Sequence, residues 1–513
     1  MRVELFLKRR LKRVRKLFAF LRDERMALFD DAFQAELESM YRQTGAGKAP
    51  VPPALMAMAV LLQGYVGCSD AEAVELSVVD LRWQMVLGRL GETTPAFSQG
   101  ALLNFRHRLI AANMDRRLLE RTAELARSTG GFDARKLPKT LRVAMDSSPL
   151  VGAGRVEDSI NLLAHAGRNV ARCAAVLLKR GVDDVCRSAG IPLLLASSVK
   201  KGLDRVWTTP GEKVDALNQL VAQLDSLETW LESELSGQVT KPPLGEELAT
   251  LRRLREQDLE PDPDGPGVRI REGVARERRV SVEEPEMRHG RKSKSKLFNG
   301  YKRHIAKDLD TGILVACAVA PANRPEQEAA AEMNRDIAAA GARIGELSID
   351  RGYITSPLVE QVRASGGEVL CRPWTHRNGD LFSKDQFAVD LVAMTVTCPA
   401  GQTRPIHLGR PAIFKAGVCA ACPQRERCTR AKKKGRTVQI ANDEQLQQEL
   451  RAKAATPAGR ERLRERVAVE HGLAHIGQRQ GRRARYFGTR ANLFDLRRAA
   501  ALQNLELSHR KVA

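Results

Sequence analysis

The sequence predicts a mixed α/β fold that follows an all-helical N-terminal region. Residues 1–130 show only the apolar spacing of helices. Short apolar runs typical of buried strands then occur at 141–146, 296–308, 312–322, 345–350 and 366–371. Helical patterns lie between them, at 156–287, near 325–341 and after Thr355. This order of strand, helical insertion, two strands, helix, strand, helix and strand predicts a mixed sheet.

The length and the charge of the chain limit its function. The chain has 513 residues and a formal charge of +22. That length suits two to four domains whose cores are large enough to fold without disulfides. A basic excess of this size favours a polyanionic partner, above all nucleic acid, over the substrates of a metabolic enzyme.

The cysteines and the N-terminus predict the compartment. Nine unevenly spaced cysteines do not form the framework of a secreted disulfide protein. The sequence contains no run of about 18 apolar residues, so no membrane-spanning helix is predicted. The basic residues 1–25 contain apolar stretches too short for a secretory signal, and Glu4, Asp23 and Glu24 disfavour an organelle-targeting helix. We therefore expect a soluble, cytoplasmic protein with no membrane partner.

Residues 1–135 predict a helical N-terminal domain that binds DNA. A helix over 51–67 opens with prolines, which suit a first helical turn. Another helix begins near Ser98, whose side chain can cap it, and residues 106–108 give that helix a basic side. The alternative is an ordinary solvated helix surface.

Two aspartates end predicted strands that lie far apart in the chain. Asp146 follows the apolar run 141–145, and Asp350 follows the run 345–349, 204 residues later. A buried carboxylate is costly without a partner, and two adjacent carboxylates repel each other. Magnesium relieves both costs, because it is a hard ion that prefers carboxylate and phosphate oxygens. Residues 147–149 are predicted to turn the chain immediately after Asp146.

Glu470 is the predicted third acid of this site. On a helix, Arg466 and Glu470 share one side, so the carboxylate can reach a metal at the sheet edge while Arg466 faces phosphate. The alternative is a surface ion pair between these two side chains. Asp310, Glu326 and Asp158 are rival third acids that the spacing does not exclude.

Two basic segments are predicted to contact the DNA backbone. In the first, 288–304, basic residues interleave with Phe298 and Tyr301, although both aromatics also suit the core side of a strand. The second is the C-terminal region 451–513, which has 15 Lys and Arg against 5 Asp and Glu. The predicted phosphate contacts are Arg291, Lys292, Lys294, Lys296, Lys302, Arg303, Arg466, Arg479, Arg482, Arg483 and Arg485.

Four cysteines have the spacing C-x20-C-x2-C-x5-C, which is compatible with one tetrahedral structural zinc ion. They are Cys398, Cys419, Cys422 and Cys428. A regular zinc ribbon has two knuckles and this segment has one, so free thiols are the alternative. The other five cysteines have no ligand-like spacing and are predicted to be core residues.

Five blocks of the sequence together resemble the DDE transposases of bacterial insertion sequences. They are MDSSPLVGAGRVEDSINLL, MRHGRKSKSKLFNGYKRHIAKD, LSIDRGY, CPAGQT with CAACPQRERC, and VEHGLAHIGQRQGRRARYFGTRANLFDLRRAAALQNL, in the family's order. The resemblance is strongest to the group named after insertion sequence eleven-eighty-two, and it extends to Leu505. Leu463 and Gly477 stand where related transposases carry Tyr and Lys.

The resemblance implies a ribonuclease H-like core, a mixed sheet with helices on both faces, and a triad of Asp146, Asp350 and Glu470. Two Mg²⁺ or Mn²⁺ ions at such a triad would support phosphoryl transfer. The implied reactions are cleavage at the ends of a transposable element and strand transfer into target DNA. The implied partners are double-stranded DNA, at terminal inverted repeats and target sites, and further copies of the chain in a synaptic complex. The implied location is the bacterial nucleoid.

This interpretation divides the chain into a helical DNA-binding domain, a core in three pieces, and two insertions. The predicted ranges are 1–135 for the first domain, 136–155, 288–375 and 450–513 for the core, 156–287 for a helical insertion and 376–449 for a Cys-containing insertion. Two other functions stay open: a catalytically inactive DNA-binding protein derived from a transposase, and a nuclease that cleaves without joining. The three dispersed acids favour the transposase.

Overall fold

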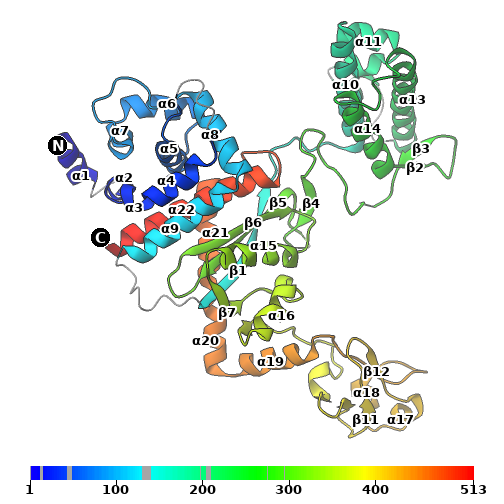
Figure 1. Ribbon diagram of the computed structural model, residues 1–513. Coiled ribbons are helices and arrows are strands. Elements are labelled where there is room, and N and C mark those ends of the chain that lie inside the picture. Colours follow the sequence, from blue (N-terminus) through cyan, green and yellow to red (C-terminus); the bar gives the residue numbers. More distant parts are fainter. Residues whose placement is uncertain are drawn as a thin grey trace.

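The mixed α/β fold predicted from the sequence is present in the computed structural model. The structure describes residues 2–11, 16–42, 49–129, 140–196, 198–203, 209–273, 275–293 and 295–512. A sheet lies near the centre with helices against it, and two smaller groups of elements project from it (Figure 1).

The central sheet has six strands, and β1 and β5 are its middle pair. Strand β5 is antiparallel to β1 on one side and to β4 and β6 on the other. Strand β1 also pairs in parallel with β7, and β7 pairs in parallel with β8. The strands are β1 (Thr140–Val151), β4 (Arg288–Arg291), β5 (Leu297–Asp308), β6 (Leu314–Pro321), β7 (Arg343–Ser348) and β8 (Glu368–Leu370). The two successive strands predicted at 296–308 and 312–322 are β5 and β6, which form an antiparallel hairpin.

Helices cover both faces of the sheet because apolar residues alternate along its strands. Val143 and Met145 pack on one face among residues of α15 (Glu326–Ala339), α16 (Pro357–Ala364) and α19 (Glu444–Ala455). Ala144 points to the other face, where α21 (Val467–Gln480) and α22 (Thr489–Val512) lie. Both layers exclude water from the sheet, so a polar side chain in mid-strand needs an open edge or a partner.

The N-terminal region is helical, as predicted. Ser98 caps its helix as expected: its Oγ accepts a hydrogen bond of 3.1 Å from the N–H of Ala101. The helices are α1 (Arg2–Leu11), α2 (Leu17–Asp23), α3 (Arg25–Leu28), α4 (Asp31–Glu38), α5 (Pro53–Val66), α6 (Asp70–Val79), α7 (Leu81–Leu87), α8 (Gln99–Ala111) and α9 (Met114–Ser128). No single described helix is long and apolar enough to span a membrane; α5 and α6, bent by 104°, meet the length and composition criteria only as a pair.

Helix α22 joins the N-terminal helices to the sheet. It lies beside α9 and also contacts β6 and α5 (Figure 1). At this junction the guanidinium of Arg497 donates to Asp115 of α9 at 3.1 Å and to Asp336 of α15 at 2.8 Å. Arg497 and Asp115 are both almost completely buried. This ion network ties three layers of the molecule together.

The helices that follow β1 form a unit that projects from the sheet (Figure 1). Leu163, Leu224 and Leu251 belong to a hydrophobic cluster whose members all come from residues 160–282. The elements are α10 (Ser159–Leu178), α11 (Val182–Ser188), the 3-10 turn η2 (Pro192–Leu195), α12 (Val199–Gly202), α13 (Pro210–Glu234), α14 (Leu244–Asp258), β2 (Leu259–Pro261) and β3 (Val268–Ile270).

A second projecting unit contains the four spaced cysteines. Short strands surround a small core in which Phe387, Phe414 and Val438 are buried. Its elements are η4 (Lys384–Gln386), β9 (Ala388–Asp390), β10 (Thr395–Thr397), β11 (Thr403–Pro405), β12 (Pro411–Ile413), α17 (Ala416–Ala420), α18 (Arg425–Cys428) and β13 (Thr437–Gln439). Helices α19 and α20 (Pro457–Glu465) then lead back to the sheet.

Two local predictions were wrong. The chain does not turn after Asp146, because β1 continues to Val151 along β5. Pro149 is tolerated there because pairing with β7 ends at Ala144, so one edge of β1 is open and needs no N–H. The one helix predicted to carry both Arg466 and Glu470 is two helices, α20 and α21, that meet at Arg466.

Candidate active site

Asp146 and Asp350 lie at the same edge of the sheet. The last pair in the parallel register of β1 and β7 is Ala144 with Ser348, so each aspartate lies two residues beyond that pair. Both side chains line a pocket of about 130 Å³. The convergence that the two strand ends predicted is therefore present, although Asp146 lies inside β1 rather than at its end.

Asp146 is a partly buried carboxylate in an unfavourable environment. Its Oδ1 accepts from the N–H of Ser147 at 2.7 Å, and its Oδ2 accepts from the Arg466 guanidinium at 3.0 Å. Burial raises the pKa of Asp146, the Ser147 N–H and the Arg466 charge oppose this shift, and the nearby Asp350 carboxylate adds to it. A bound cation would relieve both unfavourable effects.

Glu470 is connected to Asp146 through one guanidinium. Arg466 uses Nη1 for Asp146, at 3.0 Å, and Nη2 for Oε1 of Glu470, at 2.6 Å. Glu470 lies in the first turn of α21, and its side chain is 48% exposed. The ion pair that was the alternative to a metal ligand is thus present, and it extends to Asp146.

Glu326 also lines the pocket of Asp146 and Asp350. It is the first residue of α15, and its Oε1 accepts a hydrogen bond of 2.6 Å from Ser147 Oγ. The other two rival acids lie elsewhere. Asp310 accepts from Arg142 at 3.0 Å, and Asp158 caps α10.

Tyr353 and His304 are buried behind these acids. The hydroxyl of Tyr353 and Nδ1 of His304 are 2.6 Å apart. Burial raises the pKa of Tyr353 well above its usual value, and the carboxylates of Glu326 and Asp146 raise it further. Burial lowers the pKa of His304 to about 3, so the imidazole is neutral. This buried pair therefore adds no positive charge near the acids.

Basic residues from β4 and β5 surround the acidic pocket. Arg291 and Lys292 are exposed and line it, and Lys302 lines it while donating to the carbonyl of Arg324 at 3.0 Å. Lys296 is exposed as well. The predicted contact Lys294 lies outside the described residues.

The prediction that Arg303 contacts phosphate is wrong. Its side chain is buried and donates to Ser148 Oγ at 2.8 Å, to Gln480 Oε1 at 3.0 Å and to the carbonyl of Gly481 at 2.9 Å. These partners occupy the guanidinium inside the protein, because alternate residues of β5 point into the core. Arg303 thus fastens the end of α21 to the sheet.

The segment after α21 brings further arginines to the end of β1. Val151 N–H donates to the carbonyl of Arg482 at 2.9 Å, and Ala484 N–H donates to the carbonyl of Val151 at 2.7 Å. Arg482, Arg483 and Arg485 are exposed there. Arg479 is less available, because it pairs with Glu506 and lies over the Tyr65 ring.

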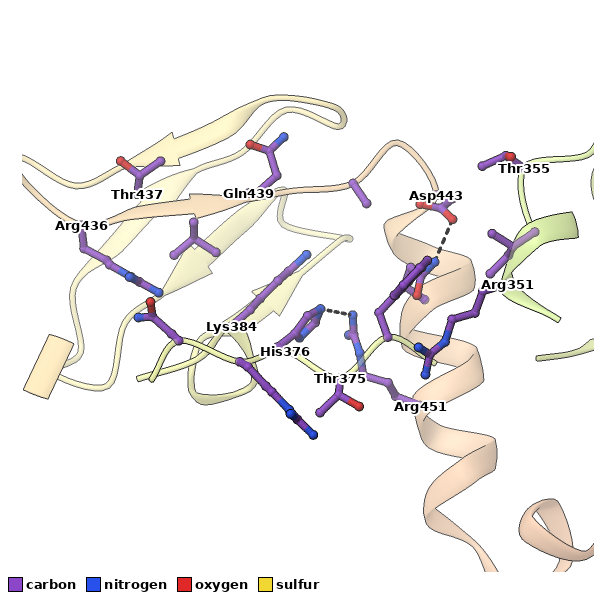
Figure 2. A pocket seen from close by; sticks show the side chains of 17 residues that line it. Arg351, Thr355, Thr375, His376, Lys384, Arg436, Thr437, Gln439, Asp443 and Arg451 are labelled. Carbon is purple, nitrogen blue, oxygen red and sulfur yellow. Dashed lines mark hydrogen bonds between the residues drawn. The ribbon is translucent and has the colours of Figure 1, made fainter. Parts of the chain in front are cut away.

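A larger basic pocket of about 870 Å³ opens next to Asp350. Figure 2 shows Arg436 on one side of it and Arg351, which follows Asp350, on the opposite side. The Arg351 guanidinium lies 4.7 Å from the ring centre of Trp374, and this ring is half exposed. Arg377, Lys384 and Arg451 also line the pocket, and Asp443 is its only lining acid among the described residues. None of the DNA contacts predicted from the sequence lines this pocket, although the basic and aromatic residues of PWTHR, 373–377, were a signal for it.

The four spaced cysteines gather beside the small core of their unit. Cys398, Cys419 and Cys428 pack against it. Burial raises the pKa of the Cys428 thiol, the Arg436 charge opposes this, and Cys419, Cys398 and Cys422 raise it further. Within the described part of the chain, no group of three or more His, Cys, Asp or Glu side chains is arranged to hold a metal ion.

Two protein families match the chain. The family described as "Transposase DDE domain" matches residues 264–505, and the family described as "Transposase domain (DUF772)" matches residues 8–108. The first match contains Asp350 and Glu470, whereas Asp146 lies between the two matches. No curated protein and no solved structure matches the chain. The two family matches agree with the convergent acids and the basic surroundings, and together they indicate a DDE transposase of an insertion sequence.

Proposed function

We propose that this protein cleaves DNA at the ends of its own element and joins those ends to target DNA. The observation that carries the proposal is the meeting of Asp146 and Asp350 at one edge of the sheet, with Glu470 linked to Asp146 through Arg466. These three acids are the proposed triad. The group named after insertion sequence eleven-eighty-two stays the predicted subdivision of the family.

We also propose that the sheet is ribonuclease H-like. The support is the strand order β6, β5, β1, β7 and β8, in which only β5 runs opposite to the other four, together with helices on both faces. The proposed core then comprises 136–155, 288–375 and 450–513. The helices of 156–287 and the Cys-containing unit of 376–449 would be insertions.

The pocket offers carboxylate and hydroxyl oxygens, which are the donors that Mg²⁺ and Mn²⁺ prefer, but the acids of the described residues are not arranged as a ligand set in this structure. Two such ions would activate the attacking oxygen and stabilise the leaving oxygen of an in-line displacement. Arg466 now bridges Asp146 and Glu470 as a cation between two anions. If the two acids held metal, Arg466 would be free to pair with a DNA phosphate, its predicted partner.

The basic surfaces define the proposed path of DNA. Lys292 and Arg291 border the acidic pocket, Arg482 lies at the end of β1, and the large pocket of Arg351 and Trp374 continues the path beyond Asp350. Cationic side chains neutralise the backbone phosphates, and an exposed aromatic ring stacks on bases. The N-terminal helices of 1–135 would recognise the terminal inverted repeats. Two or more copies of the chain would hold the two ends together in the bacterial nucleoid.

A reconstituted reaction tests this function. The full chain is incubated with Mg²⁺, a labelled DNA carrying both ends of the element, and a target plasmid. We expect cuts at the element ends and joined products, and we expect neither when the metal is removed by EDTA.

The same reaction separates the two rival functions. Binding without cuts, in the presence of Mg²⁺ or Mn²⁺, would indicate an inactive DNA-binding protein. Cuts without joined products would indicate a nuclease. Either result contradicts the proposed function.

The double variant Lys292→Ala, Arg482→Ala is expected to bind double-stranded DNA more weakly than the wild type. The salt dependence of this binding should also be smaller. Each neutralised phosphate contributes about 0.9 to the slope of log K against log salt, so the slope should fall by about 2. Fluorescence anisotropy of a labelled duplex, titrated over a range of salt concentrations, measures this slope. The matched control is Arg187→Ala, which removes an exposed charge from α11 in the projecting helical unit. An unchanged slope in the double variant excludes these two residues from the DNA path.

A further inference from the structure

We propose that the large basic pocket beside Asp350 binds a nucleotide of single-stranded DNA, with its base stacked on Trp374. The inference rests on the proposed function and deepens it, because it names an unpaired strand as the substrate of this part of the DNA path. It follows from a half-exposed aromatic ring, from cations that have no ion pair, and from a buried amide oxygen that has no partner.

The ring of Trp374 is held on one face and open on the other. The Arg351 guanidinium lies 4.7 Å from the ring centre, yet Trp374 is still 51% exposed and lines the pocket. Arg351 also donates to the carbonyls of Arg372 at 3.1 Å and Pro373 at 2.8 Å, which fixes the Trp374 segment beside Asp350. A fixed aromatic ring with one open face is a platform on which a nucleobase stacks.

The pocket keeps positive charge available for phosphate. The buried carboxylate of Glu444 pairs with Lys384 and lies 3.9 Å from Arg451, so it neutralises part of the charge of these two cations. Arg377 and Arg436 also line the pocket, and neither forms an ion pair with any acid in the described part of the chain. Such cations attract the phosphates of a nucleic-acid backbone.

A buried amide in the pocket wall lacks one partner. Gln447 is only 6% exposed, and its Nε2 donates to Oδ2 of Asp443 at 2.9 Å, the bond drawn at Asp443 in Figure 2. That bond fixes the amide orientation, and Oε1 then has no hydrogen-bond partner among the described residues. A buried acceptor without a donor is costly, so a donor supplied by a ligand would stabilise it. Phosphate oxygens only accept, whereas nucleobases carry N–H donors, so the amide favours a ligand with a base.

These groups fit a base that is not part of a duplex. Within a duplex, neighbouring bases cover both faces of a base and its partner occupies the pairing edge, so neither Trp374 nor Gln447 could reach it. An unpaired strand leaves the face and the edge free. A free nucleotide offers the same groups, but the pocket lies next to Asp350 on the proposed DNA path, which favours a strand of DNA.

Binding of a labelled single strand to the full chain, measured by fluorescence anisotropy, tests the inference. Trp374→Ala should lower the affinity for this strand at least about fivefold, because one stacking contact is lost. Trp374→Phe keeps an aromatic ring and should stay within about threefold of the wild type. The affinity for a duplex of the same sequence should change less than about twofold in both variants. An equal loss for single strand and duplex would overturn the inference.

The matched control is Leu408→Ala, which removes a 46% exposed apolar side chain of the same Cys-containing unit outside the pocket. It should bind single strands as the wild type does. Circular dichroism of each variant establishes that the fold is retained.

An abasic oligonucleotide separates recognition of the base from attraction of phosphate. It keeps the backbone charge and lacks bases, so Trp374→Ala should bind it as tightly as the wild type does. Arg377→Ala should bind both the abasic and the normal strand more weakly, and the slope of log K against log salt should fall by about 0.7. A loss of abasic binding in Trp374→Ala as large as the loss with bases would mean that the ring only shapes the pocket, and it would overturn the inference.

ATP distinguishes a strand from a free nucleotide. The wild type should bind the single strand at least about tenfold more tightly than ATP, since a strand contacts several cations of the DNA path. Equal affinity for ATP would assign the pocket to a free nucleotide and overturn its assignment to DNA.

The inference and the proposed function fail in different ways. If the wild type cleaves and joins element ends while Trp374→Ala binds single strands as tightly as the wild type, the inference fails and the proposed function stands. If Trp374→Ala selectively loses single-strand binding while the wild type does not cleave DNA, the proposed function fails and the pocket remains a site for an unpaired nucleotide.

Discussion

Asp350→Asn is expected to reduce DNA cleavage and joining at least about 1,000-fold. A divalent ion stabilises the charge of a phosphoryl-transfer transition state by several kcal/mol, and a loss of about 4 kcal/mol corresponds to this factor. Asn keeps the shape of the side chain and removes the negative charge that holds the ion. The same loss is expected for Asp146→Asn, because both side chains line one pocket. The measurement is the rate of end cleavage at saturating Mg²⁺.

Asp310→Asn is the matched control for this experiment. Asp310 is a partly exposed acid that pairs with Arg142 away from the pocket, and its substitution should leave the cleavage rate within about threefold of the wild type. DNA binding by Asp350→Asn should be retained, since the basic residues are unchanged. Full cleavage activity in Asp350→Asn would exclude a role for Asp350 in the reaction.

Asp115→Asn is expected to destabilise the protein by about 3–5 kcal/mol. Asp115 is buried and accepts from Arg497 at 3.1 Å, while Arg490 pairs with the same carboxylate. Removing its charge leaves the buried Arg497 with Asp336 as its remaining anion, and an imperfectly paired buried charge is costly. Because this network joins α9, α15 and α22, the loss should appear in global unfolding. Urea denaturation followed by circular dichroism measures it.

The control for Asp115→Asn is Asp184→Asn, which affects an exposed ion pair with Arg187 on α11. Exposed pairs contribute little, so its free energy of unfolding should change by less than about 1 kcal/mol. A change of similar size in both variants would mean that the Asp115 network does not stabilise the junction of the three helices.

The sequence predicted those features that depend on local spacing. The short apolar runs 141–145 and 345–349 identified the strands of Asp146 and Asp350, and the period of helices identified α5, α8 and α15. Ser98 was identified as a cap because only a side-chain oxygen at that position satisfies the free N–H groups of a first turn. Strand ends of one sheet meet at an edge, so the convergence of the two aspartates also followed from the pattern.

The remaining features of the site depend on contacts between segments that are distant in the chain, which local spacing does not record. Arg303 reads as a surface cation in the sequence, yet the register of β5 against β1 directs it to Ser148 and the end of α21. The extension of β1 beyond Asp146 depends on β5, because pairing over nine residues stabilises a strand that Pro149 alone would interrupt. The sequence by itself determined the family, the mixed α/β class and the two aspartates. Only the tertiary structure decided that Arg466 bridges Asp146 and Glu470, that Glu326 reaches their pocket and that a basic pocket opens beside Asp350, since each of these requires side chains from separate elements to meet in space.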